Sequence, residues 1–130
     1  MPAAPGALEL VNLAATAATS KGAIDLVALD VSEPLPITDA FLICSGRSER
    51  NVQAIADAIE DALNERGVKT KRREGRSEGR WVLLDFGDLI CHVFHEEERL
   101  YYGLERLWKD APVIAVTGVS LQVSPAEAAR

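Results

Sequence analysis

Two apolar runs on either side of a Gly87-Asp88 pair form the clearest pattern in the chain. Such a pattern predicts a β-hairpin with a type II′ turn, because glycine readily adopts the positive φ that the first central position requires. The expected register pairs Trp81 with Phe94, Val82 with Val93, Leu83 with His92, Leu84 with Cys91, Asp85 with Ile90 and Phe86 with Leu89.

The two faces of this hairpin differ in character, because side chains alternate between faces along a strand. One face is wholly apolar and belongs on a core: Val82, Leu84, Phe86, Leu89, Cys91 and Val93. The other, which we call the mixed face, carries Trp81, Leu83, Asp85, Ile90, His92 and Phe94. Its aromatic residues suit either a core beneath a second helical layer, which periodicity favours, or an interface anchor, a role in which tryptophan is common.

Helical and strand-like periodicities alternate along the rest of the chain. Ser48 and Gly67 carry the capping signals of the clearest helix. A charge-rich strand before the hairpin is expected near a sheet edge. In order, we expect a helix over residues 8–21, strands over 24–31 and 39–44, a helix over 48–67, a strand over 68–74, the hairpin over 81–94, an acidic turn over 95–98 and a helix over 99–109.

This order of elements predicts a single α/β domain with a mixed sheet of about five strands and flanking helices. The second helix links two strands by a crossover, which implies a parallel pair, whereas the hairpin is antiparallel. We expect the domain to span residues 1–111 and a partly disordered C-terminal tail to span residues 112–130.

Composition narrows the class of protein. A chain of 130 residues suits one domain that buries about two thirds of its unfolded surface. The net charge of -6 argues against general nucleic-acid binding. We find no run of ~18 apolar residues and no signal-peptide pattern, so we expect a cytoplasmic protein. Cys44 and Cys91 lie in apolar runs, as expected for buried free thiols, although a disulfide stays open.

Metal and catalytic chemistry find little support in the sequence. His92 and His95 would point to opposite faces of one strand, and the second histidine of an HExxH motif is absent. Asp85 and His92 lie diagonally across the hairpin and could form a general base with its orienting partner, but no nucleophile stands beside them. A structural or recognition pair is favoured, and we expect no metal, no cofactor and no catalytic residue.

The Ser45-Gly46 turn before a helix N-terminus could bind an anion. One glycine falls far short of a P-loop or GxGxxG motif, so a plain turn with an N-cap is favoured. A nucleotidyltransferase would add an Asp-x-Asp metal pair on a neighbouring strand. Asp85 and Asp88 are divided by the hairpin turn and do not form such a pair.

A dense basic cluster stands out in this acidic chain. Half of the 14 lysines and arginines fall within one short stretch: Arg66, Lys69, Lys71, Arg72, Arg73, Arg76 and Arg80. The cluster suits either a solvated edge strand protected by charge or a patch that meets phosphate in a ribonucleoprotein.

Three blocks of sequence carry a resemblance to a known family. The first block is the run from Trp81 to Phe94, followed by Glu98-Arg99, Tyr102 and Leu104-Glu105-Arg-Leu-Trp108. The second is Asp39-Ala-Phe-Leu-Ile-Cys-Ser-Gly-Arg-Ser, followed by Asn51-Val-Gln-Ala-Ile-Ala-Asp. The third is Glu74-Gly75 with Gly79. Over about residues 8–111 the chain resembles the ribosomal silencing factor family (RsfS, also called Iojap-like).

The resemblance implies a non-enzymatic function. Members of the family bind the large ribosomal subunit through ribosomal protein L-fourteen, block joining of the small subunit and repress translation when nutrients are short. The implied fold has nucleotidyltransferase-like topology without the catalytic residues, and members often form homodimers. The alternative is a nucleotide-binding protein or a nucleotidyltransferase-like enzyme that uses the Ser45-Gly46 turn.

With this resemblance the mixed face becomes a docking surface with Trp81 as its anchor. The residues expected to contact the ribosomal protein are Trp81, Leu83, Asp85, Phe86, Ile90, His92 and Phe94. The residues expected at a peripheral rRNA contact are Lys69, Lys71, Arg72, Arg73, Arg76 and Arg80. Phe86 stands where many relatives have tyrosine, which puts in doubt any contact through that hydroxyl. A third alternative is that the mixed face is the self-interface of a homodimer.

Overall fold

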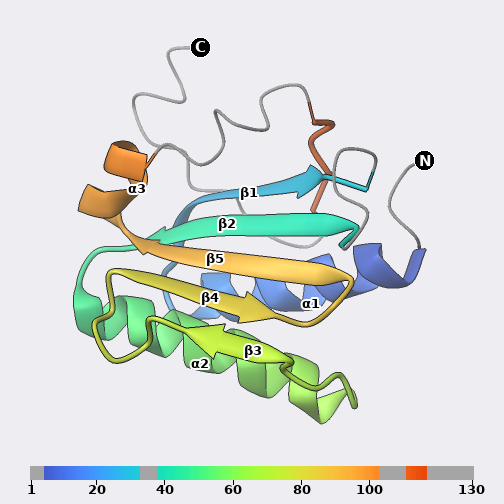
Figure 1. The fold of residues 1–130 in the computed structure, drawn as a ribbon, viewed down its shortest axis with the longest axis horizontal. Helices are drawn as coiled ribbons and strands as arrows, with labels where there is room; N and C mark the ends of the chain where they lie inside the picture. Colours follow the sequence, from blue (N-terminus) through green and yellow to red (C-terminus); the bar gives the residue numbers. More distant parts are fainter. Residues whose placement is uncertain (1–4, 33–37, 103–110, 117–130) are drawn as a thin grey trace.

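The structure, a computed structural model, describes residues 5–32, 38–102 and 111–116 of the chain. The elements follow the predicted order (Figure 1). They are α1 (Pro5–Ser20), β1 (Ile24–Asp30), β2 (Ala40–Gly46), α2 (Glu49–Glu65), β3 (Arg72–Glu74), β4 (Trp81–Asp85), β5 (Leu89–His95) and α3 (Glu96–Tyr102). The strands form one 5-stranded sheet in the order β1-β2-β5-β4-β3, which confirms the predicted single α/β domain with a mixed sheet.

The centre of the sheet is the parallel pair of β2 and β5, and the other strand pairs are antiparallel. The predicted crossover through α2 therefore exists, but the strand that lies beside β2 is β5, not β3. Both central strands are buried along their whole length, as expected for strands covered on both faces. The three residues of β3 are all exposed and charged, so this strand takes the predicted place at an edge.

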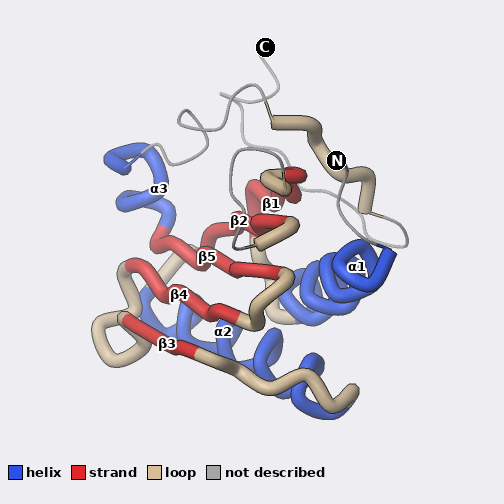
Figure 2. Tube along the Cα trace, turned by 45° about the vertical axis from the view of Figure 1, so that its right-hand side comes forward, coloured by secondary structure: helices blue, strands red, loops and turns tan. Residues whose placement is uncertain are grey.

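Both long helices cover the same face of the sheet, where α1 and α2 lie side by side (Figure 2). The apolar face of the hairpin packs there as predicted, against Val11 of α1 and Ile55 and Ile59 of α2. Hydrophobic burial on this face supplies the main core of the domain.

The hairpin has the predicted register, from Trp81 opposite Phe94 to Asp85 opposite Ile90. Gly87 has a φ of 93°, which a side chain would strain, as the type II′ turn requires. The strand register thus follows from local turn chemistry, and it fixes which side chains share a face.

The start of α2 is also as predicted. The Ser48 backbone is extended, and its Oγ accepts a hydrogen bond of 3.0 Å from the Asn51 N–H. Gly46 is needed just before it, because a Cβ there would lie 2.9 Å from the Val52 backbone nitrogen. The strand-to-helix turn is therefore tightly packed.

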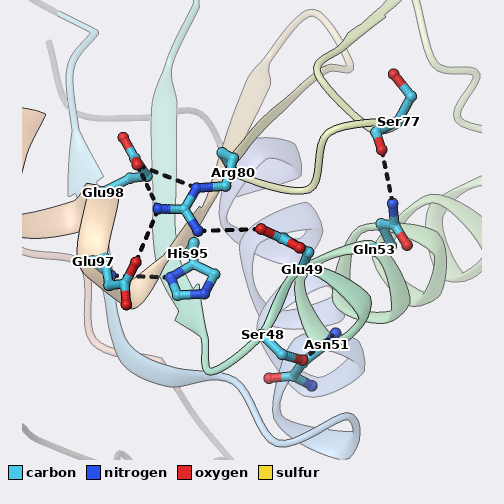
Figure 3. A network of polar contacts seen from close by, with 9 residues as sticks. All are labelled: Ser48, Glu49, Asn51, Gln53, Ser77, Arg80, His95, Glu97 and Glu98. Carbon is cyan, nitrogen blue, oxygen red and sulfur yellow. Dashed lines mark hydrogen bonds and ion pairs between the residues drawn. The ribbon is translucent and has the colours of Figure 1, made fainter.

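Several predicted boundaries were wrong. The first helix begins at Pro5 rather than at residue 8, and β2 ends at Gly46 rather than at residue 44. The predicted strand over residues 68–74 is shorter, since β3 contains only Arg72–Glu74. The predicted turn over residues 95–98 is helical from Glu96, because His95 Nδ1 accepts a hydrogen bond of 3.2 Å from the Glu97 N–H (Figure 3). Three glutamates in the first turn also stabilise the helix, because their negative charges lie at the positive end of the helix dipole. Residues 103–110 of the predicted last helix lie outside the described residues.

Residues 111–116 run along the free edge of β1. The Asp30 N–H donates to the Pro112 carbonyl and the Ile114 N–H donates to the Ala28 carbonyl, each over 2.8 Å. This short segment thereby covers part of the β1 edge. None of the helices in the described part of the chain is long and apolar enough to cross a membrane.

Candidate functional site

The mixed face lies on the side of the sheet opposite α1 and α2, and the structure divides it in two. The β5 members are buried: Phe94 has 0% of its surface exposed, His92 has 5% and Ile90 has 8%. The β4 members, Trp81, Leu83 and Asp85, are partly exposed. We call these three residues the β4 strip. The two alternatives for the mixed face thus apply to different strands: the β5 side is core and the β4 side reaches solvent.

Trp81 is held by two aromatic neighbours from β5. Its ring stacks on Phe94 with centroids 4.8 Å apart and an interplanar angle of 30°. Its indole Nε1–H donates a hydrogen bond of 3.2 Å to His92 Nδ1. A partly exposed aromatic ring that is fixed in this way is well suited to anchor an interface.

His92 sits in an aromatic pocket beneath the β4 strip. Its ring meets Phe41 of β2 edge-on, with centroids 4.9 Å apart. Burial lowers the pKa of His92 from 6.5 to about 4, because the charged form loses its hydration. The side chain is therefore neutral at physiological pH, with its proton on Nε2, since Nδ1 accepts the bond from Trp81.

The predicted pair between Asp85 and His92 is wrong. Asp85 Oδ1 accepts a hydrogen bond of 2.8 Å from the Gly87 N–H, and His92 Nδ1 is taken by Trp81. The short aspartate side chain bonds to the backbone of its own turn, which is a frequent alternative to a cross-strand pair. The mixed face therefore lacks the oriented Asp85–His92 pair that the sequence left open.

Phe86 does not share the β4 strip. It is 4% exposed and packs in the core beneath α1 and α2, on the opposite face from Trp81. The alternation of the hairpin already implies this position. Of the residues expected at a docking surface, the structure brings Trp81, Leu83 and Asp85 to solvent and places Ile90, His92 and Phe94 directly behind them.

Much of the basic cluster is paired with carboxylates of α2. Arg73 Nη1 lies 2.6 Å from Glu60 Oε2, and Arg76 Nη2 lies 2.7 Å from Asp57 Oδ2. The hydrogen bond from Arg76 lowers the pKa of Asp57 below its usual range. Both guanidinium charges are thus paired with carboxylates of α2, so the cluster is less electropositive than its sequence suggests.

Arg80 is the centre of a second ionic network (Figure 3). Its guanidinium contacts Glu49 at the start of α2 over 3.3 Å, and Glu97 and Glu98 at the start of α3 over 3.0 and 2.6 Å. These hydrogen bonds raise the pKa of Arg80 and lower the pKa of Glu97. The arginine joins two helices to the strand that carries Trp81, and its donors face the protein.

The exposed lysines of the cluster are differently placed. Lys69 and Lys71 are exposed, and neither forms an ion pair with any residue that the structure describes. Arg72 forms an ion pair with its near neighbour Glu74, over 3.1 Å. Lys71 lies over the hairpin turn, since its Nζ would be 2.8 Å from a Cβ at Gly87. Arg72 lies opposite Asp85 and the Lys71 N–H donates to the Asp85 carbonyl, so these two residues border the β4 strip. The two lysines keep positive charge for a partner.

The nucleotide alternative finds no support at the Ser45-Gly46 turn. Ser45 is fully buried, and its Oγ accepts a hydrogen bond of 2.9 Å from Arg99 Nη1. Ser48 is engaged as the N-cap. Across residues 5–32, 38–102 and 111–116, no group of three or more His, Cys, Asp or Glu side chains could hold a metal ion.

The two cysteines do not form a disulfide. Both are free and buried, and burial raises the pKa of the Cys44 thiol to about 12. A thiol in that state is a poor nucleophile. The cysteines therefore serve as small apolar side chains in the core.

Sequence reasoning missed Phe41 and the internal role of Arg80. Phe41 becomes a neighbour of His92 only because β2 lies beside β5, and nothing in the chain between residues 47 and 88 indicates that pairing. The carboxylates that bind Arg80 come from two separate helices. Only the acidic first turn of the last helix hints at them.

Comparison with known proteins gives a consistent result. The model of the family described as "Ribosomal silencing factor during starvation" matches residues 4–130, which extends beyond the stretch on which the motifs depend. The chain is 49% identical over 111 residues to the ribosomal silencing factor RsfS of Halalkalibacterium halodurans, covering 85% of this chain and 95% of that one. It is also 49% identical over 105 residues to RsfS of Bacillus subtilis, covering 81% and 89%.

A solved structure has the same fold. A crystal structure of a protein from Bacillus halodurans aligns with a TM-score of 0.75 at 45% identity, covering 83% of this chain and 98% of that chain. The similarity therefore extends over sequence and architecture together.

Proposed function

The chain belongs to the ribosomal silencing factor family, whose members are non-enzymatic regulators that associate with the large ribosomal subunit, and we propose that it acts by steric block. It docks on ribosomal protein L-fourteen through the β4 strip and keeps the small subunit from joining. In this way a cytoplasmic protein represses translation under starvation.

The observation that carries this proposal is the partly exposed Trp81, stacked on Phe94 and hydrogen-bonded to His92, on the side of the sheet opposite the two long helices. A blocking protein needs a well-packed patch of about 800 Å² rather than a reactive group. Within such a patch a few aromatic residues contribute most of the binding energy. Leu83 and Asp85 extend along the same strand and supply apolar and polar contacts beside the anchor.

The buried residues behind the strip have a supporting part in this proposal. Phe94 and His92 hold the anchor, and Ile90 fills the layer beneath it. A surface whose side chains are already ordered loses less conformational entropy when it binds. Phe86 is left out of the docking surface, because its side chain lies in the other core.

The exposed basic side chains near the β4 strip would make the peripheral rRNA contact. Lys69 and Lys71 are the members of the predicted set that form no ion pair with a described residue, whereas Arg72 is paired with Glu74. Phosphate contacts of this kind add affinity without sequence specificity and weaken as salt is raised. Arg73, Arg76 and Arg80 instead serve the fold through their carboxylate partners.

Co-sedimentation with purified large subunits, with and without small subunits, tests the proposal. The wild-type chain should pellet with large subunits and reduce the yield of joined ribosomes. Trp81→Ala should weaken binding by about 2 kcal/mol or more, as expected for a hot-spot residue. Val113→Ala is the matched surface control, because Val113 is 69% exposed beside β1 at the far edge of the sheet.

Two results would overturn the proposal. A folded Trp81→Ala protein that binds large subunits as well as wild type would remove the β4 strip from the interface. A wild-type protein that binds large subunits and lets small subunits join would exclude the steric block. If the mixed face is instead a self-interface, light scattering would show that Trp81→Ala dissociates a dimer.

A further inference from the structure

We infer that His92 is a positioning residue for Trp81: it holds the indole in the orientation in which Trp81 meets its partner and makes no contact with that partner itself. The inference rests on the proposed function, in which Trp81 is the anchor. It assigns a role to a buried histidine that neither packing nor catalysis explains.

The geometry of the pair supports this role. Trp81 is opposite Phe94 in the hairpin and His92 is opposite Leu83, so Trp81 and His92 are diagonal neighbours on one face. Phe94 sets the plane of the indole by stacking, with centroids 4.8 Å apart. The hydrogen bond of 3.2 Å to His92 Nδ1 then sets the direction in which the ring points within that plane.

His92 cannot reach a partner in this arrangement. It is 5% exposed, and Phe41 lies edge-on to its ring at 4.9 Å. Any effect of His92 on binding must therefore pass through a neighbour that is exposed. Trp81 is the partly exposed neighbour to which it is hydrogen-bonded.

The second ring nitrogen supplies an independent observation. His92 Nε2 is buried and has no hydrogen-bond partner among the residues that the structure describes. An unpaired buried donor destabilises a fold, and a phenylalanine in the same pocket would avoid that cost. The bond to Trp81 is the polar interaction that a histidine gains here, which is the pattern expected where stability is given up for function.

The test uses a Trp108→Phe background. The chain has two tryptophans, so in this background Trp81 is the sole source of tryptophan fluorescence. His92→Phe removes the acceptor and keeps an aromatic ring, whereas His92→Asn keeps an acceptor close to the Nδ1 position. Cys91→Val is the matched control, because Cys91 is the neighbouring residue on β5 and faces the other core. Each variant is measured for melting temperature, Trp81 emission and quenching, and binding to purified large subunits.

We expect His92→Phe to melt at the wild-type temperature or above it, to shift Trp81 emission and increase its quenching, and to bind large subunits about tenfold more weakly, as for one lost hydrogen bond. His92→Asn should recover most of that loss. A purely structural histidine would show the reverse: a lower melting temperature with unchanged binding by the folded protein.

The outcomes separate this inference from the proposed function. If Trp81→Ala binds normally, the proposed anchor is wrong. If Trp81→Ala loses binding while folded His92→Phe binds and emits as wild type, the anchor stands and the positioning role is overturned. If His92→Phe does not fold, His92→Leu, which also removes the acceptor, is combined with Trp81→Phe in a double-mutant cycle, because positioning predicts that the loss of the acceptor adds nothing once the indole N–H is gone.

Discussion

Arg80 and Glu98 meet through two hydrogen bonds, from Arg80 Nη2 and Nε to Glu98 Oε1 over 2.6 and 3.2 Å (Figure 3). The backbone follows the same path, since the His95 N–H donates to the Arg80 carbonyl over 2.8 Å. The residue just before Trp81 is thereby fastened to the first turn of α3. The positive charge of Arg80, which the sequence suggested for an RNA contact, instead fixes the start of the strand that carries Trp81.

Arg80→Ala should therefore act on the fold more than on electrostatic binding. We expect Tm to fall by about 2–4 °C, a modest effect because the side chain is 34% exposed and its ion pairs are screened by water. Amide exchange should rise in the first turn of α3. The salt dependence of binding to large subunits should not change, and a clear decrease in that dependence would show that Arg80 meets phosphate after all.

The lysines predict the opposite behaviour. Replacing Lys69 and Lys71 together by alanine should leave Tm within a degree or two and should lower the slope of log affinity against log salt by about 1–2, because each phosphate contact releases about one counterion. Binding at several salt concentrations measures this slope. Arg73→Ala with Arg76→Ala is the matched control, since it removes equal charge from side chains that α2 already neutralises. Equal slopes for both double variants would remove the rRNA contact from the lysines.

How much of the fold could be predicted from the sequence depends on how far apart in the chain the interacting residues lie. The hairpin register was predictable because Gly87 and its flanking apolar runs determine it locally. The cap at Ser48 was predictable for the same reason. The place of β2 beside β5 was not, because it is set by burial of both strands after the chain has passed through α2, β3 and β4.

The candidate site shows the same limit. Alternation identified the residues of the mixed face, but it could not show that the β5 members are buried and the β4 members reach solvent. Alternation also could not predict the hydrogen-bond partners of the polar residues. Asp85 bonds to its own turn and His92 to Trp81, although each is within reach of the other by spacing alone.

Phe86 offers a direct test of which face carries the interface. Phe86→Leu should lower the free energy of unfolding by about 1–2 kcal/mol, because it leaves space in a closely packed core. Binding of the folded protein to large subunits should be unchanged, since the side chain is 4% exposed beneath the helices. Urea unfolding and co-sedimentation measure the two effects. A loss of binding without a loss of stability would return Phe86 to the docking surface.

His92 also predicts how stability depends on pH. Its pKa is lowered from 6.5 to about 4 by burial, so the unfolded chain binds a proton near pH 6 while the native chain does not. Stability contributed by the neutral histidine is therefore fully present above pH 6.5 and is lost as pH falls towards 4. The loss over this window is about 3 kcal/mol, at about 1.4 kcal/mol for each unit of pKa shift. Urea unfolding at intervals between pH 4.5 and 7.5 would measure this loss. The free energies can be compared where the dependence on urea concentration has the same slope at each pH.

The control for this titration is His92→Phe, whose stability should be nearly flat over the same interval. Asp57 and Glu97 also have lowered pKa values, but the ion pairs of these carboxylates weaken only as pH falls below their ordinary range near 4. Their contribution begins to fall only at the acid end of the window and is the same in His92→Phe, so the difference between the two proteins reports the histidine. A wild-type protein as flat as His92→Phe would mean that His92 takes up its proton in the native state, which would break the bond from the Trp81 indole because a protonated Nδ1 cannot accept it.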